Sequence, residues 1–244
     1  MLIRKYLNNF LNSFKKNNYL IKSDWIIETR QKKLGVQFHS NDIETLIIGS
    51  SHGAYAFNPQ FYSNKAFNLC TASQDLYYSN KLYELYQKKL TKLKTVILFY
   101  SVFSPGFSLN HTIEHPRCVI FRKEFGIDYQ IFKDEFSKYE NKYPNLNSEF
   151  DIIELINFWG YDNPSFFFSS NIPITDRVKS HLRENQRLGN HENKHLISLI
   201  NGCKLNNHKL IVVITPARTD YKNNLPSSNE LFKSLFDLNL TYKF

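Results

Sequence analysis

Apolar residues in this chain gather in short runs that are separated by longer stretches of mixed polarity. Runs at 46–48, 95–102 and 209–215 are rich in Leu, Ile and Val, which predicts strands that are buried on both faces. A shorter run at 65–69 predicts one more strand, and residues 240–244 predict a last one. The pattern therefore predicts five strands.

Between these runs, apolar residues recur three and four positions apart, as on one face of a helix. This spacing covers residues 71–93, 175–206 and 229–237. Strands that alternate with helices predict a parallel sheet with helices on both faces. We therefore expect a single α/β domain over residues 1–244, with three α/β/α layers and a central five-stranded parallel sheet.

Two segments depart from this alternation. Within residues 1–43, positions 1–20 predict an amphipathic helix with basic flanks, and positions 21–43 predict a polar connector into the first strand. The helix packs on the domain or on a partner subunit, or it lies on an anionic membrane surface. Residues 107–175, which hold many Tyr, Phe and Asn, predict an insertion between strands three and four, as a lid or a substrate platform.

Composition narrows the class of protein. Hydrophobic residues make up 42% and aromatic residues 16% of the chain, which excludes an intrinsically disordered protein. No apolar run reaches the roughly 20 residues that cross a bilayer, and no secretory leader pattern is visible. The three cysteines are far apart, which favours a reducing compartment. We expect a cytoplasmic protein, with peripheral contact at the inner membrane through residues 1–20 as the alternative.

The net charge of +9 comes mostly from lysines that are spread along the chain. No strong basic run and no nucleic-acid-binding motif accompanies it, so we expect a solvated basic surface and no nucleic-acid partner. Gly189-Asn-His-Glu192 matches part of a metallophosphoesterase signature, but the Asp-x-His and Gly-His-x-His parts are absent. We therefore expect no metal and no cofactor.

The first predicted strand ends in a turn that carries candidate catalytic residues. Gly49 follows the apolar run, and Ser50, Ser51 and Gly53 suit a tight turn into a helix. In a parallel sheet this turn lies at the C-terminal edge, beside helix N–H groups that stabilise negative charge. A serine nucleophile requires this placement. Ser51 is the candidate nucleophile, with its own amide as an oxyanion donor, and the alternative is an ordinary serine cap.

Polar residues that follow the other strands are expected at the same edge, because parallel strands end on the same side. Asn68 follows the second run, and Ser101 and Ser104 follow the third. The full set of candidate oxyanion and substrate-binding residues is Ser50, His52, Gly53, Asn68, Ser101, Ser104, Asp220 and Tyr221.

A serine hydroxyl needs an imidazole to take its proton and a further group to orient that imidazole. His191 and His195 are four residues apart on a predicted helix, so they share a face and are the candidate bases, with Glu192 nearby. The alternatives for this pair are metal binding and a solvated helix face. His52 adjoins Ser51 and is expected to line the pocket or the oxyanion side. The remaining candidate bases are His111, His115 and His181.

These motifs resemble the SGNH (GDSL-type) hydrolase superfamily. Leu46-Ile-Ile-Gly-Ser-Ser51 is similar to its nucleophile block, with Gly49-Ser50-Ser51 in place of Gly-Asp-Ser. Phe67-Asn68-Leu69-Cys70 and Leu98-Phe99-Tyr100-Ser101 lie where the second and third blocks follow their strands. Residues 209–216 are similar to the fourth strand, and weak matches extend over most of the chain from about residue 44.

The resemblance implies the SGNH/flavodoxin-like topology and a serine esterase or acyltransferase without cofactor. The pattern is closest to divergent bacterial members associated with modification of surface polysaccharides. The implied substrate is an ester-modified surface polysaccharide or its precursor, that is, a carbohydrate or acyl ester. The alternative is a non-catalytic protein of the same fold that binds glycan or a partner protein in polysaccharide biosynthesis.

The chain also departs from the family pattern. Ser50 replaces the Asp of the first block, and Cys70 and Ala72 stand where the second-block Gly donates to the oxyanion. The third-block Asn is absent, with Ser101 or Ser104 as substitutes. No Asp-x-x-His block occurs after residue 216. Either the sequence is truncated, or another histidine is the base, or the protein does not hydrolyse by this mechanism.

Overall fold

The centre of the protein is a parallel sheet in the strand order β2-β1-β3-β4. The structure is a computed structural model that describes residues 21–63, 65–144, 152–162, 173–188, 190–214 and 219–225. The four strands of the described ranges are β1 (Thr45–Gly49), β2 (Ala66–Asn68), β3 (Thr95–Tyr100) and β4 (Lys209–Ile214). The prediction of an α/β fold with a parallel sheet is confirmed. The predicted helix at 229–237 and fifth strand at 240–244 lie outside the described residues.

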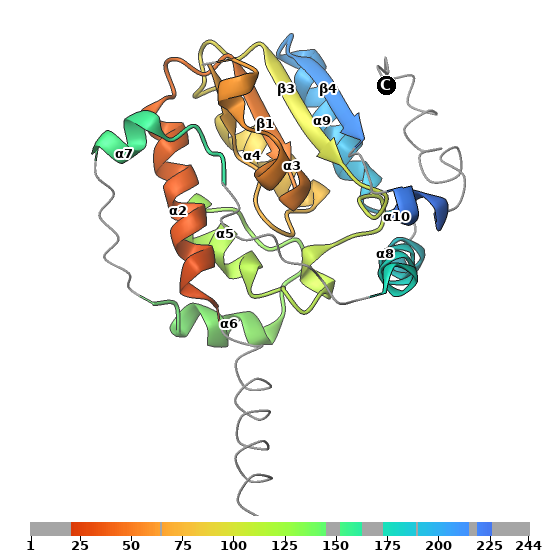
Figure 1. Cartoon of the computed structure of the whole chain (residues 1–244). Coiled ribbons are helices and arrows are strands. Elements are labelled where there is room, and N and C mark those ends of the chain that lie inside the picture. The colour runs from red at the N-terminus through yellow and green to blue at the C-terminus, as the bar shows by residue number, and fades with distance from the viewer. Residues whose placement is uncertain are drawn as a thin grey trace, which may run out of the picture.

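Strand β1 lies inside the sheet, between β2 and β3. Leu46 pairs with Phe67 of β2 and with Val96 of β3, and all three pairings in the described sheet are parallel. The C-terminal ends of the strands therefore meet at one edge. In Figure 1 the arrowheads of β3 and β4 point toward helices α8 (Ile174–Leu188) and α10 (Thr219–Asn223), which lie beyond that edge.

The two faces of the sheet carry different cores, because side chains alternate along each strand. Leu46, Ile48 and Leu98 face the larger core, together with buried side chains of α4 (Leu76–Tyr86) and α9 (Asn193–Leu205). Ile47, Ile97, Phe99 and Ala54 form a smaller core on the other face, and Ala54 belongs to α3 (Ser51–Ala56). Figure 1 shows α4 and α9 on one side of the sheet and α3 on the other.

Residues 23–38 form a helix, α2 (Ser23–Phe38), so the prediction of a polar connector over 21–43 is wrong there. The helix packs against α5 (Arg117–Phe125) and α7 (Ile152–Asn157). Its buried face includes Thr29, Lys32 and Gly35 beside Ile26 and Val36. Because polar and small residues occupy this face, the sequence lacks the regular spacing of apolar residues that predicts a helix.

The chain between β3 and β4 is mostly helical where it is described. It includes η2 (Leu109–His111), α5, α6 (Asp134–Asn141), α7 and α8. Helix α5 contributes buried Cys118, Val119 and Phe121 to the larger core, so this part of residues 107–175 belongs to the core. A short 3-10 turn, η1 (Pro59–Phe61), precedes β2.

The predicted helix at 1–20 lies outside the described residues. Among the helices that the structure does describe, none combines the length and the apolar character that a membrane crossing requires.

Candidate active site

The turn after β1 presents Ser51 at the C-terminal edge of the sheet. Gly49 has φ 136°, a backbone angle that favours glycine, and a Cβ at this position would lie 2.7 Å from the Phe99 carbonyl oxygen. Ser50 is extended and precedes α3, of which Ser51 is the first residue. The Gly49-Ser50-Ser51 sequence therefore forms a sharp strand-to-helix turn, and Ser51 remains half-buried.

Ser51 lines a pocket of about 340 Å³. Within the described ranges its hydroxyl has no hydrogen-bond partner. The pocket lies between the turn after β1, the loop after β3 and helix α8. The residues that line it are Ser50, Ser51, His52, Ser73, Phe103, Phe107, Thr112, Arg177, Ser180 and His181.

His52 is held between two strand ends by serine hydroxyls. Its Nδ1 lies 3.1 Å from Ser50 Oγ and 3.0 Å from Ser101 Oγ, within hydrogen-bond distance of both. Burial lowers the pKa of His52, because a charged imidazole is poorly solvated there. His52 is therefore neutral at pH 7, with Nδ1 occupied and no described hydrogen-bond partner at Nε2.

His181 enters the same pocket from α8. Its Nδ1 lies 2.6 Å from the hydroxyl of Tyr221 on α10, and its ring meets the Phe103 ring edge-on at 5.0 Å. Burial, with smaller contributions from His52 and Arg177, lowers the pKa of His181 to about 4. At neutral pH the pocket thus holds a second uncharged imidazole that is fixed at Nδ1.

Aromatic rings form one wall of the pocket. Phe103 and Phe107 meet at a centroid distance of 5.3 Å, and the His52 ring lies 5.8 Å from Phe103. Apolar rings beside a few hydroxyl and imidazole groups are the combination that small-molecule pockets commonly show.

Backbone amides beside Ser51 are available for a developing negative charge. In the described structure the first amides of α3 to bond a carbonyl are those of Gly53 and Ala54, both to Ser50 O. The amides of Ser51 and His52 have no backbone acceptor among the described residues, as expected for the start of a helix. The Cys70 amide, at the second-block position, already donates to Asn68 Oδ1 over 3.0 Å.

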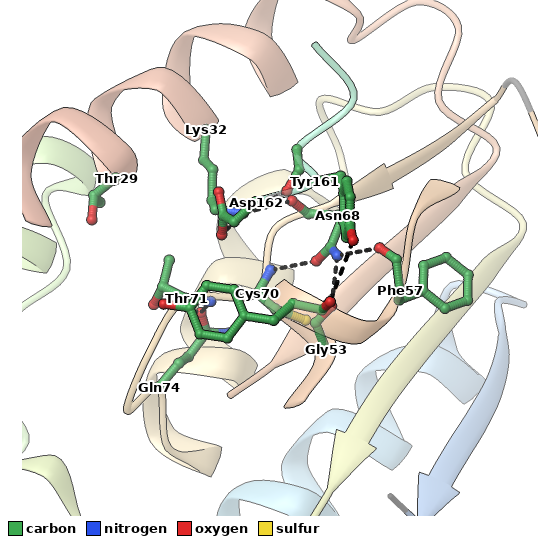
Figure 2. A network of polar contacts seen from close by, with 12 residues as sticks. Thr29, Lys32, Gly53, Phe57, Asn68, Cys70, Thr71, Gln74, Tyr161 and Asp162 are labelled. Atoms are coloured by element: carbon green, nitrogen blue, oxygen red, sulfur yellow. Dashed lines mark hydrogen bonds and ion pairs between the residues drawn. The ribbon is translucent and has the colours of Figure 1, made fainter. Parts of the chain in front are cut away.

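Asn68 is buried behind the turn that carries Ser51 and does not belong to the described pocket lining. Its side chain is fully buried, and its Nδ2 donates to the carbonyls of Gly53 and Phe57, each over 2.8 Å. Figure 2 shows these bonds together with the one from Cys70. The amide ties β2 to α3, so Asn68 supports the turn that carries Ser51 and is not among the described residues that line the pocket.

The two histidines that the sequence predicted as general bases, His191 and His195, lie away from the Ser51 pocket. His195 Nε2 is 3.1 Å from Gln130 Nε2 and 3.7 Å from Glu192 Oε2, and its ring packs edge-on against Tyr77. His191 is exposed in the turn before α9. Neither histidine is among the described residues that line the Ser51 pocket.

The other predicted residues support the pocket or stand beside it. Gly53 faces the sheet, where a Cβ would lie 2.4 Å from Cys70 Sγ. Ser104 Oγ accepts the Ser101 amide over 2.9 Å and so fixes the loop after β3. Asp220 is exposed and accepts the Tyr221 amide over 2.9 Å, which leaves Tyr221 as the residue of this pair that reaches the site through His181.

Sequence reasoning did not select the residues that complete the pocket. Ser73, Phe103, Arg177 and Ser180 belong to no motif, and His181 was one of several candidate bases. The only local signal was the four-residue spacing of Arg177 and His181, which puts both on one helix face.

The described residues include no group of three or more His, Cys, Asp or Glu that could hold a metal ion. Comparisons of the chain with protein-family models, with curated proteins and with solved structures found no match.

Proposed function

We propose that the protein is a serine esterase or acyltransferase in which Ser51 is the nucleophile and His181 is the general base. The observation that supports this most is a Ser51 hydroxyl without a hydrogen-bond partner among the described residues, in a pocket with two neutral imidazoles, His52 and His181, each held at Nδ1. The candidate base assigned from the sequence changes accordingly, from His191 and His195 to His181.

The proposed reaction follows from these positions. Ser51 Oγ attacks the ester carbonyl and its proton passes to His181 Nε2, in the tautomer whose Nδ1–H donates to the Tyr221 oxygen. The amides of Ser51 and His52 donate to the oxyanion of the tetrahedral intermediate. The intermediate expels the alcohol, which takes the proton from His181. Water or an acceptor hydroxyl then attacks the acyl-enzyme by the reverse sequence and releases Ser51.

The remaining sequence-based expectations become part of the proposal. The strand order β2-β1-β3-β4 and the site at its C-terminal edge support an SGNH-like topology, to which residues 240–244 would add a fifth strand. The aromatic wall of Phe103 and Phe107 can cover one face of a sugar ring or an acyl chain. The proposed substrate is an ester-modified surface polysaccharide or its precursor.

Hydrolysis assays with Ser51→Ala test the assignment. We expect turnover of 4-nitrophenyl acetate and of an acetylated sugar to fall at least about 1,000-fold, because the nucleophile is removed. Ser23→Ala, at an exposed serine on α2, is the matched control and should keep full activity. If Ser51→Ala hydrolyses every ester that the unmodified protein does, Ser51 is not the nucleophile.

The second candidate function is binding without catalysis, by a protein of the same fold. Two observations favour it: neither imidazole makes a hydrogen bond to Ser51 Oγ among the described contacts, and no carboxylate lines the described pocket. This candidate predicts no turnover of any ester together with retained affinity for an oligosaccharide, measured by calorimetry.

A further inference from the structure

One charged side chain in the pocket has no role in the proposed reaction. Arg177 lies on α8 one turn before His181, so the two side chains share a helix face and both line the cavity. The positive charge of Arg177 also contributes to the lowered pKa of His181. The guanidinium therefore lies close to the proposed base.

Arg177 has no carboxylate partner in the part of the chain that the structure describes. Its neighbour Asp176 lies 3.9 Å from Lys179 instead. Behind the pocket wall, Glu114 accepts the Ser73 hydroxyl and pairs with Arg117 Nε at 3.1 Å. No Asp or Glu lines the described pocket, so among the described residues no carboxylate of the lining neutralises the positive charge of Arg177.

The surroundings of Arg177 suit an oxyanion. A guanidinium donates two parallel hydrogen bonds to the oxygens of a carboxylate or phosphate, and it remains charged at every relevant pH. Ser180, on the same helix, adds a hydroxyl donor to the same cavity, which Ser51 also lines. A volume of about 340 Å³ accommodates an acidic group together with a short acyl or sugar moiety.

We propose that the pocket binds a substrate that carries an oxyanion group, a carboxylate or a phosphate, which Arg177 holds while the ester carbonyl faces Ser51. That the bound anion is an ester substrate rests on the proposed function, because the ester is cleaved by the proposed reaction at Ser51. Anion binding itself depends only on Arg177 and the cavity.

Calorimetric titrations of the full chain with benzoate, phenylphosphonate and benzamide test the proposal. Benzamide has the shape of benzoate without its charge, so we expect both anions to bind more tightly than benzamide. Arg177→Gln should weaken the anions at least about 10-fold and leave benzamide unchanged, because a charge-assisted hydrogen bond is lost. Arg177→Lys should retain part of the affinity.

Lys179→Gln is the matched control, because it removes a charge from the same helix at a side chain that is 77% exposed. It should bind the anions as the unmodified protein does. Equal affinity for benzoate and benzamide, unchanged anion affinity in Arg177→Gln, or an equal loss in Lys179→Gln would each overturn the proposal.

A Ser51→Ala variant separates this inference from the proposed function. Retained anion binding in Ser51→Ala, without any Ser51-dependent ester turnover in the unmodified protein, would leave the anion site standing and remove the esterase. The opposite outcome would be Ser51-dependent turnover that shows no preference for 4-nitrophenyl hemisuccinate over 4-nitrophenyl butyrate, with the same ratio in Arg177→Gln. That outcome would support the esterase and remove the anion site.

Discussion

Two histidines line the same pocket as Ser51, and neutral groups hold both of them. His52 is fixed by the hydroxyls of Ser50 and Ser101, and His181 by the phenol of Tyr221. A hydroxyl partner orients an imidazole but does not stabilise its charged form as a carboxylate does. Together with burial, this arrangement keeps both rings neutral at physiological pH, so they are ready to accept a proton.

The pH dependence of turnover follows from the His181 pKa of about 4. The imidazole must be neutral to take the Ser51 proton, so kcat/KM should fall as the pH drops through about 4 and stay level from there to neutrality. An ordinary histidine would produce this fall near pH 6.5. Initial rates at constant ionic strength, with tryptophan fluorescence to confirm folding at each pH, measure it. An inflection near 6.5 would show that His181 is not the base.

At this scale the sequence predicted the turn that carries Ser51 but did not single out His181, which lines the same pocket. The Gly49-Ser50-Ser51 turn was recognisable because a glycine and two serines directly follow an apolar run. His181 is 130 positions away in a polar helix, and only the tertiary fold brings it to the pocket. His191 and His195 were predicted as bases because their four-residue spacing puts them on one helix face. In the structure His195 contacts Gln130 and Glu192 and does not line the described Ser51 pocket.

Helix α2 depends on a buried lysine. Lys32 is fully buried, and its Nζ lies 2.8 Å from Asp162 Oδ2 and donates to the Gly160 carbonyl over 2.5 Å. Figure 2 shows Lys32 beside Asp162, above the network of Asn68. The contact joins α2 to the chain that follows α7. A lysine at such a position was not predictable, because lysine is almost always exposed and the sequence gives no sign of its distant partner.

Replacing Lys32 should therefore destabilise the protein. In Lys32→Met the Asp162 carboxylate loses its counter-charge inside the protein, which costs about 3–5 kcal/mol of unfolding free energy. Lys33→Met is the control, since Lys33 is 29% exposed and its contact with Glu124 is 3.6 Å long; its effect should stay below about 1 kcal/mol. Urea denaturation measures both. Equal losses in the two variants would contradict the structural role of Lys32.

The turn between β1 and α3 depends on Gly49, whose positive φ and close contact with β3 exclude a larger residue. Gly49→Ala forces a Cβ into the Phe99 carbonyl within the sheet, and we expect a loss above about 3 kcal/mol or failure to fold. Gly126→Ala is the matched control: Gly126 also has positive φ, 70°, but nothing lies within 4 Å of its Cβ position. It should lose only about 1–2 kcal/mol in denaturant unfolding. A tolerated Gly49→Ala would show that the turn is not constrained as described.

At the scale of the molecule, the parallel sheet explains why residues from separate segments meet. Ser51 directly follows β1 and Ser101 directly follows β3, so the ends of these two parallel strands place both residues at one edge. The apolar runs were sufficient to predict this framework. Helix α8 lines the pocket beyond that edge and α10 packs against α8 (Figure 1), and the positions of both depend on side-chain packing that a linear pattern does not encode.

The most direct test of the Ser51–His181 pair is the rate at which a fluorophosphonate modifies the native protein, with the modified residue located by mass spectrometry. We expect modification at Ser51, at a rate that falls at least about 100-fold in His181→Ala and is unchanged in His195→Ala. A native protein in which Ser51 stays unmodified, or a His181→Ala variant that reacts as fast as the unaltered chain, would contradict it.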